Sequence, residues 1–181
     1  TGATGFIGQS LVHALQSQEQ PVKPYTGKLN DALALPAAMS DVKSIVHLAG
    51  AETHGRPRLL QRVDIEGTER LLAEAKHAAV EKIVVISRLN ADPNSIYPLL
   101  RAKGLVERQV RHSDLPYNII RSATLFGRRD RFLNMILSLA AWTWPFIVLP
   151  GGGLVAMQPL WVEDLVRCLV ECLDRPDLTG K

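Results

Sequence analysis

Apolar residues recur along this chain at two different spacings, which predict helices and strands in alternation. Helical spacing, with apolar residues three and four positions apart, predicts six helices. They cover residues 6–18, 32–39, 58–79, 98–112, 131–143 and 163–173. Unbroken aliphatic and β-branched runs instead predict buried strands. The expected strands cover residues 21–26, 44–50, 82–87, 115–121, 147–149 and 158–162.

Strands that alternate with helices predict βαβ units and a parallel sheet. The expected fold class is therefore α/β, with a doubly wound parallel sheet and helices on both faces. The strand at 21–26 runs almost directly into residues 27–31. Because a parallel crossover needs a dozen or more residues, we expect one βα crossover to be missing there.

The chain opens on a glycine-rich stretch, Thr1–Gly8, in which Gly2, Gly5 and Gly8 are spaced three apart. A turn of this kind that opens a helix lets the backbone approach a pyrophosphate, and the helix N-terminus then attracts the anion. This fingerprint ordinarily follows a buried strand. We therefore expect a short apolar strand before Thr1.

The composition is that of one globular domain over residues 1–181, since 46% of its residues are hydrophobic and 22% are charged. Residues 151–181 are expected to begin a small substrate or partner region. A formal net charge of +3 is only mildly basic and does not by itself imply nucleic-acid binding, and no recognised motif for it is present. No ligand spacing suggests a metal. Cys168 and Cys172 are expected to be buried free thiols, which indicates a cytoplasmic location.

Motifs along nearly the whole chain resemble those of the short-chain dehydrogenase/reductase superfamily, in its extended and atypical branches. The matching segments, in order, are Thr1–Gly8, Gly27–Asp31, His47–Gly50, Asp64–Thr68, Ser87, Lys103, Pro116–Arg121, Phe126–Gly127 and Gln158–Leu165. The chain is similar to NAD-dependent epimerase/dehydratase-like and NmrA-like proteins, and to the accessory subunit of respiratory complex I in the same group. The resemblance implies a Rossmann-type sheet.

The resemblance also implies a cofactor, NAD or NADP. The residues expected to bind it are Gly2, Thr4, Gly5, Phe6, Ile7, Gly8, Leu48, Ala49, Gly50, Ser87 and Lys103. Lys28 stands where the family has an acid beside the adenosine. Lys23 and Lys28 would suit a 2′-phosphate and hence NADP, although the choice between the two cofactors stays open.

The family's catalytic tyrosine is displaced in this chain. It ordinarily lies four residues before the lysine, one helical turn away, where the lysine lowers its pKa. Here that position holds Leu99, and Tyr97 lies six residues before Lys103. The candidate catalytic residues are Ser87, Lys103 and Tyr97, and they would serve hydride transfer on a carbonyl or alcohol. The alternative is a non-catalytic subunit.

Residues 132–150 form an uncharged stretch that Pro145 interrupts. Its helical part, at ~1.5 Å per residue, reaches about 20 Å and falls short of the ~30 Å of a bilayer. One interpretation is a core helix followed by an edge strand. The other is a surface, flanked by arginines 128, 129 and 131, that docks on a membrane or a partner. In that case the protein would be an accessory subunit or assembly factor of an electron-transfer or photosynthetic complex, peripheral to the membrane.

Overall fold

A three-stranded parallel sheet forms the centre of the chain in the computed structural model, which describes residues 1–52, 55–128, 130, 132–145, 154 and 156–180. Its strands are β1 (Ser44–His47), β2 (Lys82–Arg88) and β3 (Tyr117–Ser122), in the order β1-β2-β3. Ile45 pairs with Ile83, and Ile83 pairs with Tyr117, so β2 is the central strand. Three of the predicted strands are thereby confirmed.

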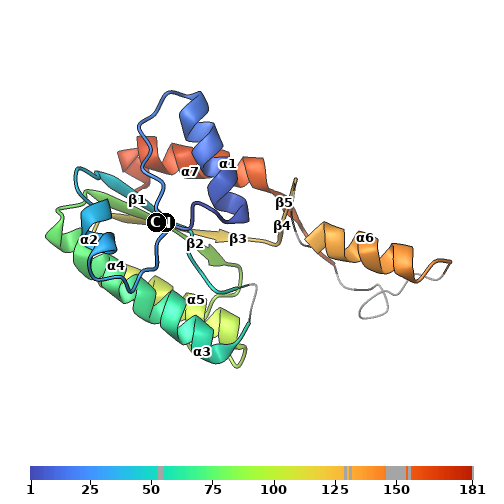
Figure 1. The fold of residues 1–181 in the computed structure, drawn as a ribbon. Helices are drawn as coiled ribbons and strands as arrows, with labels where there is room; N and C mark the ends of the chain where they lie inside the picture. Colours follow the sequence, from blue (N-terminus) through green and yellow to red (C-terminus); the bar gives the residue numbers. More distant parts are fainter. Residues whose placement is uncertain (53–54, 129, 131, 146–153, 155, 181) are drawn as a thin grey trace.

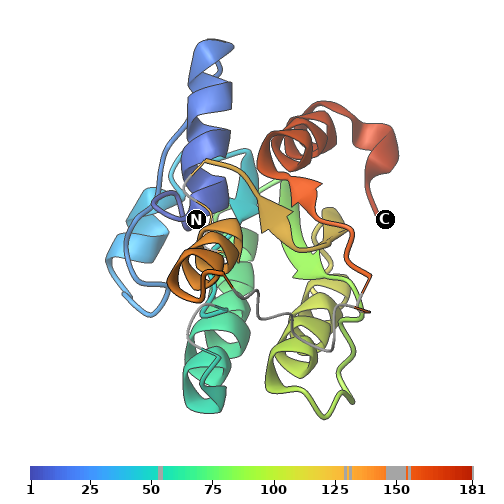
Figure 2. The same cartoon turned by 90° about the vertical axis from the view of Figure 1, so that its right-hand side faces the viewer.

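Helices cover both faces of the sheet (Figures 1 and 2). On one face, Ile83 and Val85 of β2 pack against α4 (Glu66–His77) and α5 (Pro98–Arg111). On the other face, Val84 and Ile86 pack against α1 (Phe6–Ser17) and α7 (Val162–Asp174). Side chains alternate along a strand, so the unbroken β-branched run supplies both cores. The predicted doubly wound α/β fold is confirmed.

The helix predicted over residues 58–79 has three parts. These are α3 (Pro57–Leu60), a π-helical turn (Gln61–Ile65) and α4. The π-helical turn carries Asp64, whose side chain is buried. Turns of this kind recur at functional sites because they re-aim one residue within a helix.

The strand expected at residues 21–26 is absent. The chain between α1 and α2 (Ala34–Ala38) forms no helix or strand, and all of these residues are described. Pro21 and Pro24 lack the backbone N–H that a sheet ladder requires, which disfavours a strand here. A βα crossover is therefore missing from this stretch, as predicted.

A second, smaller pair of parallel strands, β4 (Leu125–Phe126) and β5 (Leu160–Trp161), leads to a helix that projects from the body (Figure 1). This helix, α6 (Phe132–Trp142), has no buried residue. The core-helix interpretation of this segment is therefore wrong. The expected strand at 147–149 lies outside the described residues. None of the described helices has the length and apolar character needed to cross a membrane.

The end of α7 is held by the amino group of Lys82, which donates to the backbone carbonyls of Cys172 and Arg175. A cation suits the unpaired carbonyls at a helix C-terminus. Both cysteines are free thiols, but only Cys172 is buried, whereas Cys168 is exposed. The expectation that both are buried is wrong because Cys168 lies on the solvent side of α7. A short 3₁₀-helix, Pro176–Leu178, follows.

Candidate functional site

A cavity of about 650 Å³ lies at the carboxyl ends of β1, β2 and β3, beside the N-terminus of α1. In open parallel α/β sheets, ligands bind at this edge. Its lining comes from the glycine loop, the ends of the three strands, the π-helical turn, α4, α5 and the start of α6. The lining residues used below are Gly2, Thr4, Gly5, Phe6, Ile7, Gly8, His47, Leu48, Ala49, Gly50, Glu52, Asp64, Arg88, Lys103, Ser122, Leu125, Asp130 and Phe132.

The glycine loop packs so tightly that side chains are excluded from it. A Cβ on Gly8 would lie 2.2 Å from the carbonyl oxygen of Gly2, and a Cβ on Gly2 would lie 2.7 Å from the backbone of Leu48 and Ala49. Gly2 also has a φ of +73°, which glycine adopts without strain. These contacts place the loop directly against the end of β1.

The N-terminus of α1 is open towards the cavity. Gly5 is the N-cap residue, and no side chain caps the first turn. The Gly5 N–H donates to the Gly2 carbonyl at 3.0 Å. The next residues, Phe6, Ile7 and Gly8, form the first turn of α1 and line the cavity. Uncapped helix amides and the positive end of the helix dipole suit an anion. This glycine cradle therefore fits a pyrophosphate.

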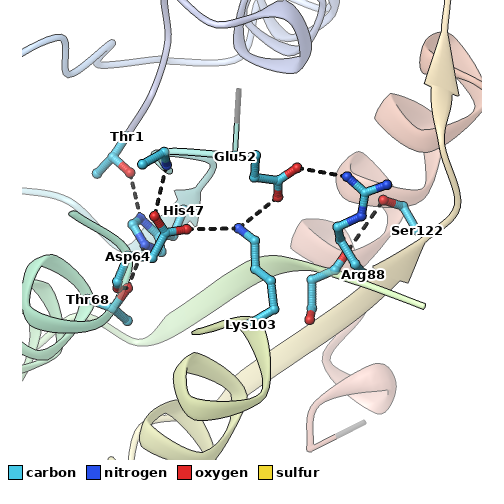
Figure 3. Close-up of polar contacts among 10 residues, drawn as sticks. Thr1, His47, Glu52, Asp64, Thr68, Arg88, Lys103 and Ser122 are labelled. Atoms are coloured by element: carbon cyan, nitrogen blue, oxygen red, sulfur yellow. Dashed lines mark hydrogen bonds and ion pairs between the residues drawn. The ribbon is translucent and has the colours of Figure 1, made fainter. Parts of the chain in front are cut away.

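Lys103 is clamped between two carboxylates on the cavity wall (Figure 3). Its Nζ lies 2.9 Å from Glu52 Oε1 and 3.3 Å from Asp64 Oδ1, and its side chain is only 8% exposed. Burial acts to lower the pKa of Lys103, but the two carboxylates outweigh it and raise the pKa. Lys103 is therefore charged and already paired.

Glu52 joins this lysine to Arg88, whose Nη1 lies 3.2 Å from Glu52 Oε2. Burial acts to raise the pKa of Glu52, but Lys103 and Arg88 prevail and lower it. Asp64 is fixed from the other side, because its Oδ2 accepts the backbone N–H of Ala51 at 2.8 Å. A Cβ on Gly50 would lie 2.9 Å from Asp64 Oδ1, so this glycine makes room for the carboxylate.

His47 occupies the end of β1 and is 4% exposed. Its Nδ1 lies 2.7 Å from Thr1 Oγ1, and its Nε2 lies 3.0 Å from Thr68 Oγ1 (Figure 3). Burial, followed by the nearby Thr1 amine and Lys103, lowers the pKa of His47 to about 3. The ring is neutral at pH 7 and holds two threonine hydroxyls together.

The structure does not bring the three candidate catalytic residues together. Lys103 lines the cavity, but Ser87 is fully buried on the α5 side of β2, beside the Glu107 carboxylate. Its Oγ makes no hydrogen bond of regular geometry. Tyr97 is 63% exposed at the N-terminus of α5 and is not among the described lining residues. Arg88, the residue of β2 after Ser87, lines the cavity instead.

Ten of the eleven expected binding residues line the cavity, namely nine from the glycine loop and residues 48–50 together with Lys103, whereas Ser87 does not. Lys23 and Lys28 do not. The Lys23 amino group donates to the Ser40 carbonyl at 3.2 Å, and Lys28 is exposed. In the part of the chain that the structure describes, no group of acidic, histidine and cysteine residues is arranged to hold a metal ion.

Sequence reasoning missed Glu52 and Arg88 as members of the site. Arg88 is the last residue of β2 and Glu52 lies in the loop after β1, where polar residues of neighbouring parallel strands meet at one edge of the sheet. Their position at the carboxyl ends of two predicted strands was the sequence signal that could have identified them. Asp64 was recognised only as part of a motif, because the π-helical turn that directs it inward leaves no mark in the spacing of apolar residues.

Comparison with known proteins agrees with this fold. The cavity edge, the glycine loop and the parallel sheet define the chain as a Rossmann-fold nucleotide-binding domain. A family model described as NAD(P)H-binding matches residues 18–131, so the chain belongs to that NAD(P)H-binding family. Solved structures share the fold; MoeE5 in complex with UDP-glucose and NAD superposes with a TM-score of 0.79 at 22% identity, over 98% of this chain and 72% of that one.

The curated relatives are of different kinds. Subunit 9 of the NADH dehydrogenase [ubiquinone] 1 alpha subcomplex of Mus musculus is 28% identical over 99% of this chain and 54% of its own length. Ceramide reductase of Caulobacter vibrioides is 30% identical over 98% of this chain and 61% of its own length. The photosystem II assembly factor Ycf39 of Cyanophora paradoxa is 25% identical, with coverages of 69% and 44%. The chain spans about half the length of the first of these.

Proposed function

We propose that this chain is the dinucleotide-binding domain of an atypical short-chain dehydrogenase/reductase-like protein that holds NAD(P)(H) without turning it over. The observation that carries this proposal is the clamp on Lys103, whose amino group is paired with Glu52 and Asp64. In the family, that lysine would lower the pKa of a tyrosine one turn away, yet Leu99 occupies this position.

The binding part rests on the glycine cradle. The pyrophosphate would lie at the amides that follow Gly5, and the backbone of Leu48, Ala49 and Gly50 would contact the rest of the ligand. A bound nicotinamide ring can supply or accept a hydride. The residues of this chain would bind and orient the ligand, and Lys103 would present its remaining N–H to a ribose hydroxyl.

Hydride transfer on a carbonyl or alcohol also needs a group that donates or accepts a proton. The proposed lack of turnover follows because no candidate among the described residues of the cavity is suited to this role. A side chain that donates or accepts a proton during the reaction is most effective when its pKa lies close to the working pH. Burial keeps the pKa of His47 far below neutrality, and the carboxylates keep that of Lys103 above its ordinary value. Tyr97, the remaining candidate with a transferable proton, is exposed outside the cavity.

Thermal unfolding with NADH or NADPH tests the binding. Ligand at 100 times its Kd stabilises a fold by about 2.7 kcal/mol, which is several degrees of Tm. Gly5→Ala should abolish most of this shift. Its Cβ would lie 3.2 Å from the Gly2 carbonyl, so the fold should survive. No shift with either dinucleotide would remove the proposed function.

Turnover is tested by NADPH consumption with a panel of ketones and nucleotide sugars. We expect no rate above the uncatalysed one. A rate that disappears in Lys103→Met, while that variant still binds the dinucleotide, would establish an oxidoreductase and overturn the non-catalytic part of the proposal.

We also infer that residues 1–181 form a single domain to which a further strand, before Thr1, belongs, and that residues from 151 onwards begin a small substrate or partner region. The Thr1 amine donates to the Val46 carbonyl at 2.7 Å, and the Leu48 N–H donates to the Thr1 carbonyl at 3.2 Å. This bonding is that of a parallel neighbour of β1. A longer chain that begins upstream should unfold at a higher temperature than residues 1–181.

A second proposed role is docking to a membrane-embedded complex through α6 and the residues that follow it. Trp142 and Trp144 are 86% and 79% exposed, and Met135 and Leu137 of α6 are exposed as well. Large exposed apolar patches mark interaction sites. By their names, two relatives are a subunit of the NADH dehydrogenase [ubiquinone] 1 alpha subcomplex and a photosystem II assembly factor, which supports a peripheral location.

Sedimentation with native membranes, compared with protein-free anionic vesicles, tests this docking. Trp142→Ala with Trp144→Ala should release the protein, whereas the control pair Leu33→Ala with Ile96→Ala should not. The control residues are equally exposed, at 85% and 83%, but lie away from α6. Binding to protein-free vesicles as strong as binding to native membranes would indicate lipid instead of a protein partner. Binding to neither would contradict the second proposed role.

A further inference from the structure

The segment between α1 and β1 contributes nothing to the cavity wall. The described lining residues come from the glycine loop, from the ends of the strands, from the π-helical turn, and from α4, α5 and the start of α6. None comes from residues 10–46, although every one of these is described. Among the described residues, the cavity at the carboxyl edge of the sheet therefore has no wall on the side of this segment.

That flank is where a dinucleotide-binding fold ordinarily reads adenosine. The ligand crosses the switch point of the sheet with one nucleotide over each half, and a residue about 20 positions after the glycine loop contacts the adenosine ribose. In this chain the equivalent stretch is residues 25–31, which forms no strand and follows no crossover.

The polar groups of this stretch are bonded to their own neighbourhood. The Tyr25 hydroxyl donates to the Lys28 carbonyl at 2.9 Å. Asp31 accepts the backbone N–H groups of Leu33 and Ala34 at 3.1 and 2.9 Å, so its carboxylate caps α2. The Lys23 amino group is held by the Ser40 carbonyl, at 3.2 Å. The carboxylate of Asp31 and the amino group of Lys23 are therefore already engaged by backbone groups nearby in the fold.

The opposite flank is fully built. From the glycine cradle, the cavity extends over the ends of β2 and β3 to Leu125 and Phe132, with Lys103 and Arg88 on its wall. It therefore offers a phosphate cradle, charged groups for ribose hydroxyls, and an apolar end for a planar ring. These are the needs of the nicotinamide mononucleotide half of the ligand.

We propose that the cavity recognises the nicotinamide mononucleotide half of a dinucleotide and leaves the 2′ position of the adenosine ribose unread. This inference rests on the proposed function. Its consequence is that NADH and NADPH bind alike, since the 2′-phosphate that distinguishes them meets solvent.

Isothermal titration of the purified chain with NADH, NADPH, reduced nicotinamide mononucleotide and ADP-ribose tests the inference. We expect the Kd values for NADH and NADPH to agree within about threefold, which is less than 1 kcal/mol. The reduced mononucleotide should bind at least as tightly as ADP-ribose. Lys23→Ala and Lys28→Ala should leave both dinucleotide affinities unchanged.

The outcomes separate this inference from the proposed function. A preference of about tenfold or more between NADH and NADPH, or ADP-ribose binding more tightly than the mononucleotide, would overturn the inference while leaving dinucleotide binding intact. A loss of NADPH affinity alone in Lys28→Ala would do the same, because it would show that the segment reads the 2′-phosphate. Failure of all four ligands to bind would instead remove the proposed function itself.

Discussion

Lys103 Nζ lies 2.9 Å from Glu52 Oε1, and this contact joins helix α5 to the loop that follows β1. Asp64 reaches the same amino group from the π-helical turn at 3.3 Å. Three separate elements therefore meet at one buried cation, which fixes the wall of the cavity. The arrangement explains why Lys103 is retained in a chain that has Leu99 where the tyrosine would lie.

Removing the charged amino group of Lys103 should lower the free energy of unfolding. Lys103→Met leaves Asp64 buried and facing a second carboxylate, and breaking a buried pair in this way costs about 3–5 kcal/mol. The measurement is the free energy of unfolding in urea. The matched control is Lys76→Met, which breaks the exposed pair with Asp114 and should cost at most about 1 kcal/mol. Equal costs for the two variants would contradict this account of the clamp.

His47 should make stability fall as the solution is acidified below pH 6.5. Its pKa is about 3 in the folded chain and 6.5 in the unfolded one, so the unfolded state takes up the proton first. The contribution of His47 to stability is therefore full above pH 6.5 and is lost as the pH falls towards 3, by at most about 1.4 kcal/mol per pH unit.

Urea unfolding between pH 5 and 6.5 measures this slope. The window lies above the range in which Glu52 and Glu107 lose their contribution, because the pKa values of both carboxyls are lowered from 4.5. His47→Asn should flatten the slope, while His13→Asn, at an exposed position, should keep it. An unchanged slope in His47→Asn would mean that other groups bind the proton.

Arg121 is expected to stabilise the fold and not the ligand. Its Nε and Nη2 bind the two oxygens of the buried Glu107 at 2.8 and 2.7 Å, and Nη2 also donates to the Ala91 carbonyl. Arg121→Met leaves Glu107 with Arg111 alone and should cost roughly 2–3 kcal/mol. The Kd for NADH of the folded variant should equal that of the parent chain. Arg167→Met, at an exposed ion pair, is the control for stability.

Tyr97→Phe should change neither the melting shift with NADH nor the free energy of unfolding beyond about 0.5 kcal/mol. The tyrosine is exposed, and its hydroxyl lies outside the cavity lining. Thermal unfolding with and without NADH checks this. A reduced ligand shift in Tyr97→Phe would show that this side chain folds over the bound ligand.

Most of the fold could be predicted because its signals are local. The β-branched run of β2 and the helical spacing in α5 each identify their elements within a few residues. The segment at residues 21–26 was misjudged because its few apolar residues fit a strand, while Pro21 and Pro24 leave it unable to complete a ladder.

The site was predictable only in part, for a different reason. The glycine cradle is contiguous in the sequence, so its spacing marks it directly. The clamp of Glu52, Asp64 and Lys103 joins residues from three elements, and no spacing along the chain reports such a meeting. The inward direction of Arg88 instead of Ser87 depends on the register of β2 relative to the cavity, which emerges only when the sheet is assembled.

The most direct test of the central claim, that a dinucleotide phosphate is held where the glycine loop enters α1, is amide NMR during titration with NADH. The account predicts that the backbone amides of Gly5, Phe6 and Ile7 shift most, together with those of Leu48–Gly50, while the amides of α7 stay in place. Saturable binding that leaves the amides of Gly5, Phe6 and Ile7 unmoved would contradict it.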